Sequence, residues 1–146
     1  MVYGKPVLGH YEYTLDKKNR LFIPAKHREA LGGELIIGPS FKDDSLTVFS
    51  QDDFNDICVK VEENFDEDEK YAMEEEFFTK CDTYSPDDQG RITLNATHVD
   101  MGGLAGTVII EGVGHRAKIW ASDRYANKGA SAPKKTLREL ADKGKL

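Results

Sequence analysis

The sequence has few of the features that mark an exported, membrane-bound or metal-binding protein. No apolar run among its 146 residues approaches the ~20 residues of a membrane-spanning helix. The N-terminal stretch lacks the apolar segment of a signal peptide. Its two cysteines, Cys58 and Cys81, form no CxxC pair, and no HxxxH or Cys/His spacing is typical of a metal site. We therefore expect a cytoplasmic protein with free thiols, no membrane contact, no metal and no cofactor.

Catalytic signatures are scarce as well. The sequence has no Ser-His-Asp signature and no Gly-rich phosphate loop, and its glycine pairs fall where helices are expected to end. The many acidic residues occur in runs that are typical of solvated helix surfaces. One alternative stays open, a small enzyme that uses His27 and His98 as a pair, although their spacing gives it no support. We predict that the protein is not an enzyme.

The chain as a whole is acidic, but two of its segments are basic. The net charge is −6, which by itself argues against a nucleic-acid partner. Residues 1–31 nevertheless carry a net charge of +3, and residues 81–146 carry +2. Residues 50–80 hold twelve acidic and three basic residues, a net charge of −9 that hides the two basic segments. A polyanion responds to a local basic face, so the net charge is a poor guide here.

The most basic segment is residues 14–31, TLDKKNRLFIPAKHREAL. Alternating, β-rich composition predicts a strand over 11–15 and another over 20–23. Between them, Asp16 can accept backbone N–H bonds, and Asn19 tolerates a positive φ, so 16–19 is expected to be a tight turn. Pro24 suits the first turn of a helix that the following glycines end.

The rest of the chain is expected to alternate short strands and helices. Strands are expected over 34–38, 46–49, 83–86, 91–94, 107–111 and 117–121. Helices are expected from 51 to about 63, from 66 to about 79, over 95–101, from 122 and for a turn or two after 133.

The first pattern returns later in the chain. A shift of 71 residues pairs Asp16 with Asp87, Asn19 with Gly90, Arg20 with Arg91, His27 with His98 and Phe49 with Trp120. A unit of about forty residues buries little surface alone, so two copies are expected to complete one core. The predicted class is α+β, with two pseudo-symmetric β-hairpin repeats forming a β-rich lobe.

The internal repeat divides the chain into four parts. They are a first repeat at 8–54, an acidic helical connector at 55–80, a second repeat at 81–126 and a C-terminal tail at 127–146, mobile at its end.

The basic residues of the first repeat have two interpretations. Lys17, Lys18, Arg20, Lys26 and Arg28 could form a solvated surface, or they could bind DNA together with Arg91. Arginine forks suit phosphates and guanine edges, and a two-stranded ribbon fits the major groove. Duplicated ribbons could contact successive grooves. The other residues of the motif, Asp16, Asn19, Asp87 and Gly90, are expected to shape the turns.

Residues 16–28 also resemble the DxKGRxxxPxxxR signature of the MraZ family of bacterial regulators, through Asp16, Lys18, Arg20, Pro24 and Arg28. A second, related box follows from Asp87, with Arg91 at the place of its first arginine. The resemblance implies an AbrB-like swapped-hairpin fold. It also implies a nucleoid-associated transcription factor that assembles into rings and binds double-stranded DNA at promoter direct repeats of the division and cell-wall gene cluster.

The second box departs from this signature. Asn95 and Val99 stand where proline and arginine are usual, and Asp88 adds negative charge beside Arg91. In the first box, Asn19 replaces the glycine. We therefore assign DNA contact mainly to the first hairpin and architecture mainly to the second. The alternative function is a protein-interaction scaffold whose acidic, aromatic helices bind a basic partner.

Overall fold

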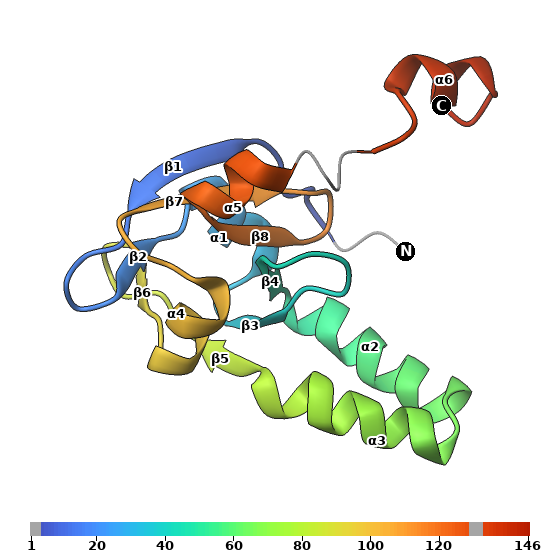
Figure 1. The fold of residues 1–146 in the computed structure, drawn as a ribbon, viewed down its shortest axis with the longest axis horizontal. Helices are drawn as coiled ribbons and strands as arrows, with labels where there is room; N and C mark the ends of the chain where they lie inside the picture. The colour runs from blue at the N-terminus through green and yellow to red at the C-terminus, as the bar shows by residue number, and fades with distance from the viewer. Residues whose placement is uncertain (1–3, 129–132) are drawn as a thin grey trace.

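A computed structural model describes residues 4–128 and 133–146, and its fold is α+β (Figure 1). Within these residues the strands form a six-stranded antiparallel sheet and a two-stranded antiparallel ribbon. The sheet runs in the order β1 (His10–Thr14), β7 (Thr107–Gly112), β8 (Ala117–Ala121), β4 (Leu46–Phe49), β3 (Leu35–Pro39) and β5 (Asp82–Tyr84). The ribbon pairs β2 (Arg20–Phe22) with β6 (Arg91–Thr93). The helices are α1 (Ala25–Leu31), α2 (Gln51–Asn64), α3 (Glu67–Glu76), α4 (Ala96–Gly102), α5 (Ser122–Asn127) and α6 (Leu137–Asp142), with a 3₁₀ turn at Phe78–Lys80.

The two repeats exchange strands. β1 of the first repeat pairs with β7 of the second, and β5 of the second repeat pairs with β3 of the first. β2 pairs with β6, so the expectation of two separate ribbons is wrong, and the repeats share one ribbon. The central residues of that ribbon, Leu21 and Ile92, lie opposite each other and are fully buried. Pairing across the repeats lets both side chains enter one core.

The sheet buries both of its faces at strands β3 and β4. Leu35 and Ile37 join the main core cluster, while Ile36 points to the other side and joins Phe49 in a second cluster. This alternation follows from the two-residue period of a strand. The ribbon residues Leu21 and Ile92 belong to the main cluster, and the connector helices supply residues of the second.

The connector projects from the lobe as a pair of helices (Figure 1). Ser50 accepts a bond from the backbone N–H of Asp53 and begins α2, while a capping box at Asp66 begins α3. α3 has no buried residue. The helix expected to reach Thr79 ends at Glu76, because Phe77 turns into the second core cluster.

The C-terminal segment contains α6, which confirms the helix expected after Pro133. Residues 129–132 of the predicted tail lie outside the described residues. The division of the chain at 8–54, 55–80, 81–126 and 127–146 stays a prediction.

The two ends of the ribbon are built differently. Gly90 has a φ of 82°, and a Cβ there would come within 2.8 Å of the Arg28 guanidinium carbon. At the other end, Asn19 takes a φ of 61° and lies with Val99 beside an open hollow of about 660 Å³. Val99 is the repeat equivalent of Arg28. Asn19 and Val99, which both depart from the MraZ-like signature, are therefore connected. Because valine replaces the large arginine at position 99, the first turn has room for the side chain of Asn19 where the signature has glycine.

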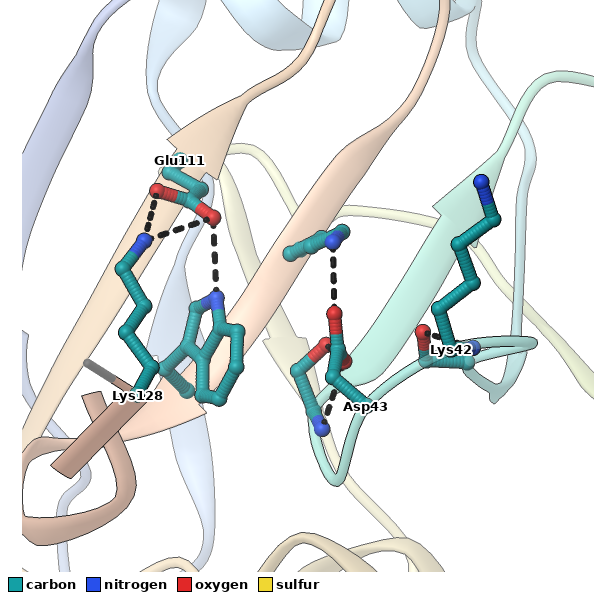
Figure 2. Close-up of polar contacts among 8 residues, drawn as sticks. Lys42, Asp43, Glu111 and Lys128 are labelled. Atoms are coloured by element: carbon teal, nitrogen blue, oxygen red, sulfur yellow. Dashed lines mark hydrogen bonds and ion pairs between the residues drawn. The ribbon is translucent and has the colours of Figure 1, made fainter. Parts of the chain in front are cut away.

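Partly buried carboxylates hold the cations of the β7–β8 half of the sheet (Figure 2). Glu111 accepts hydrogen bonds from Trp120 Nε1 at 3.0 Å and from Lys128 Nζ at 3.1 Å. Asp43 accepts bonds from Lys118 Nζ at 2.6 Å and from the Ser45 backbone N–H at 3.0 Å. Partial burial would raise the pKa of Asp43, but these hydrogen bonds outweigh burial and lower the pKa to about 2.

We predict a compensating pair at the Gly90 end of the ribbon. Gly90→Asn should lower the free energy of unfolding by about 2 kcal/mol, since its side chain would collide with Arg28. Arg28→Val in the same chain should recover part of this loss, with a coupling of about 1 kcal/mol. Urea unfolding of the two single variants and the double variant measures both values. The control is Gly32→Asn, which has a positive φ but no neighbour within 4 Å of a Cβ; strict additivity would contradict the packing argument.

We also predict a pH-dependent loss of stability in Asp43→Asn. Because folding lowers the pKa of Asp43, its contribution is present above about pH 4 and disappears as the pH falls toward 2. At pH 7 the variant should be less stable than the wild type by about 1 kcal/mol, and the two should converge near pH 2. Thermal unfolding between pH 2 and pH 7 measures this difference. Asp88→Asn, at an exposed turn position, is the control. A constant difference between Asp43→Asn and the wild type would contradict the assignment.

Candidate nucleic-acid interface

The ribbon presents one face to solvent. Leu21 and Ile92 point into the core, so their neighbours along each strand point outward. Arg20 lies opposite Thr93, and Phe22 lies opposite Arg91. The structure therefore brings Arg20 of the first repeat and Arg91 of the second onto the same exposed face.

A carboxylate in the preceding turn orients Arg20. Asp16 accepts the backbone N–H groups of Lys18 at 2.9 Å and of Arg20 at 2.8 Å. Its second oxygen accepts Arg20 Nε at 2.6 Å. The bond from the Arg20 backbone is the main cause that holds the pKa of Asp16 below its ordinary value. Because the pairing uses Nε, it leaves the two Nη groups of the arginine fork outside the turn.

The second turn repeats this geometry. Asp87 accepts the backbone N–H groups of Gln89 and Arg91, each at 2.9 Å, and Arg91 Nε at 3.0 Å. The Arg91 backbone N–H lowers the pKa of Asp87 in the same way. Both arginines are thus held by the same pattern of aspartate hydrogen bonds, and about a third or less of each side chain is exposed.

The basic residues that are contiguous in the sequence occupy three places in the fold. Lys17 and Lys18 are exposed on the first turn, which lies at the end of β6 because the Leu94 N–H donates to the Asn19 carbonyl at 2.8 Å. Lys26 is exposed near the start of α1. Arg28 is partly buried over Gly90, and its Nε donates to the Ile23 carbonyl at 3.1 Å. Arg28 therefore fastens the ribbon to the second turn.

Sequence reasoning missed two residues of this face, Phe22 and Thr93. They are equivalent in the two repeats, and both are exposed. Alternation around Leu21 could have placed Phe22 outside. The pairing of Phe22 with Arg91 depends on the strand exchange, which local alternation does not reveal.

The two histidines of the rival enzyme hypothesis are fixed by the fold. Both are almost fully buried. Nε2 of His27 donates to the Leu8 carbonyl at 2.6 Å, and Nε2 of His98 donates to the Lys80 carbonyl at 2.8 Å. Nδ1 of His98 then accepts from the Tyr84 hydroxyl at 2.7 Å. Each ring connects its helix to the segment before the first strand of its repeat, an architectural role that needs no reaction.

A second hollow, lined partly by basic residues, lies near the β7–β8 turn, and its main cations are paired. Arg116 forms two bonds to the buried carboxylate of Asp53, at 2.7 and 3.0 Å, and Lys118 bonds to Asp43. Among residues 4–128 and 133–146, no three His, Cys, Asp or Glu side chains form a group that could hold a metal ion. No helix in the described part of the chain has the length and apolar character needed to cross a membrane. The ribbon face remains the best candidate for recognising a ligand.

Comparison with known proteins identifies the family. The family model described as "MraZ protein, putative antitoxin-like" matches residues 7–75. A protein named Transcriptional regulator MraZ from Saccharopolyspora erythraea is 35% identical over 81% of this chain and 82% of its own. Proteins of the same name from Carboxydothermus hydrogenoformans and Symbiobacterium thermophilum are 34% and 33% identical, over 93% of this chain and 94% and 98% of theirs. Since these relatives align with the chain over most of its length, it belongs to the MraZ family.

Proposed function

We propose that this protein is a sequence-specific DNA-binding transcriptional regulator that uses the outer face of the β2–β6 ribbon. The observation that carries the proposal is the pair Arg20 and Arg91, which the register places on one exposed face. A two-stranded ribbon fits the major groove, where an arginine fork can bind the O6 and N7 atoms of guanine. The names of the curated relatives, which are those of transcriptional regulators, support the same function.

Each group of basic residues has its own task in this proposal. Arg20 and Arg91 read base edges, and Asp16 and Asp87 hold the two arginines in a fixed orientation, which reduces the entropy lost on binding. Lys17, Lys18 and Lys26 contact phosphates, which supply affinity without sequence information. Arg28 acts mainly through the ribbon that it fastens. The first hairpin therefore dominates the electrostatic attraction, and the second adds one base contact.

The acidic connector fits this arrangement. In Figure 1, helices α2 and α3 lie far from the ribbon, on the other side of the sheet. The strongly acidic segment is thereby kept away from the phosphates, which limits repulsion. The alternative scaffold function assigns binding to these helices instead. A salt titration separates the two functions, since phosphate contacts release counterions and a scaffold has no DNA affinity to lose.

The wider biological setting follows from the family resemblance. We propose a cytoplasmic, nucleoid-associated homo-oligomer, ring-like in form, that binds direct repeats in the promoter of the division and cell-wall gene cluster. One ribbon offers few contacts, so several subunits on successive repeats would gain affinity through multivalency. The four parts of the chain, 8–54, 55–80, 81–126 and 127–146, would serve as two binding repeats, a connector and a tail.

We predict that Arg20→Ala weakens binding to DNA from the protein's own upstream region. Loss of one bidentate base contact should raise Kd about tenfold or more and leave the melting temperature nearly unchanged, because Arg20 lies outside the core. Fluorescence anisotropy at two salt concentrations measures the effect. Lys60→Ala on α2 removes one exposed positive charge away from the ribbon and should bind as the wild type does. Equal losses in the two variants would show that only total charge matters.

We predict a multi-subunit particle in solution. Light scattering should give a mass several times 16.4 kDa, and the affinity for DNA should fall steeply when one repeat of a two-repeat site is removed. A monomer whose affinity is the same for one repeat and for two would contradict the multivalent mechanism.

A further inference from the structure

Phe22 is an exposed aromatic residue on a charged face. The residue is 43% exposed, although phenylalanine is usually buried. Arg20 precedes it by two residues on the same face, and Arg91 lies directly opposite. The ring of Tyr13 supports it from one side, with 6.0 Å between ring centroids. Phe22 therefore lies on the same ribbon face as the two arginines, with part of its surface open to solvent.

We propose that Phe22 is a specificity-determining residue that contacts the methyl group of a thymine in the major groove. This inference rests on the proposed function, since it requires the ribbon to enter the groove. The C5 methyl of thymine is the apolar group on the edges of base pairs there, and phenylalanine is among the side chains that pack against it. The arginines beside Phe22 would read guanines in the same groove.

The repeat equivalent of Phe22 supports this chemistry. Position 93 carries threonine, whose methyl group also suits a thymine methyl, and it lies opposite Arg20. Each half of the ribbon face therefore pairs one arginine with one residue able to contact a methyl group. Phe22 is the larger of the two and should make the stronger contact.

The spacing limits which thymine is read. Residues two apart on a strand are separated by about 6.7 Å. Successive nucleotides of one DNA strand rise by about 3.4 Å, so this distance spans about two base-pair steps. The thymine bound by Phe22 should therefore lie about two steps from the guanine bound by Arg20.

Removal of single methyl groups from the DNA tests the proposal. The protein's own upstream fragment is prepared as duplexes in which one thymine at a time is replaced by deoxyuridine, which keeps base pairing and removes only the methyl. For the wild type, Kd should rise about fourfold at one such position, the effect of one methyl contact. Phe22→Ala should bind the unmodified site more weakly and show no further loss at that position. Phe22→Leu, which keeps an apolar side chain, should retain the loss.

Two results would overturn the inference. One is an unchanged pattern of deoxyuridine effects in Phe22→Ala. The other is a wild type that binds tightly but shows no deoxyuridine effect at any position. If the wild type binds no DNA at all, the proposed function fails as well, whereas tight wild-type binding without a deoxyuridine effect contradicts only the role of Phe22. Melting temperatures of all three proteins confirm that the exposed position leaves the fold intact.

Discussion

Strand exchange between the repeats is the constraint on which the rest of the structure depends. Each repeat keeps one hairpin of its own, β3–β4 or β7–β8, but its other strands pair across the repeats: β1 lies beside β7, β5 beside β3, and β2 beside β6. The exchange buries Leu21 and Ile92 against each other at the centre of a shared core. A forty-residue unit alone could not bury enough apolar surface to be stable, so each repeat depends on the other for its fold.

The same exchange creates the candidate interface. Arg20 and Arg91 are 71 positions apart in the sequence, yet they share one ribbon face because β2 and β6 pair in antiparallel register. An aspartate in each turn orients both arginines in the same way, so duplication of one local motif produces two similarly held guanidinium groups. The surroundings then differ, since Lys17 and Lys18 flank the first turn and Asp88 lies on the second. The two repeats therefore have similar backbones at the ribbon but different charges around it.

The sequence predicted the elements and the repeat well, because short-range signals determine them. Asp16 and Asn19 indicated the turn, Ser50 the start of α2, and the glycines after Leu31 the end of α1. Local patterns did not predict the single ribbon, since strand partners depend on contacts between distant residues, and only the family resemblance implied swapped hairpins. The same limit applies to the packing of Arg28 over Gly90, which follows only from the exchanged strands, while the assignment of Arg28 to DNA contact stays a prediction.

Hydrogen–deuterium exchange with and without upstream DNA tests the central claim most directly, because it reports on every part of the surface at once. The account predicts slower amide exchange on DNA binding in the two turns, at 16–19 and 87–90, and in strands β2 and β6. The acidic helices α2 and α3 should not contact DNA, so their amide exchange should stay the same when DNA is added. Protection confined to α2 and α3, with none in the ribbon or its turns, would contradict the assignment of DNA binding to the ribbon.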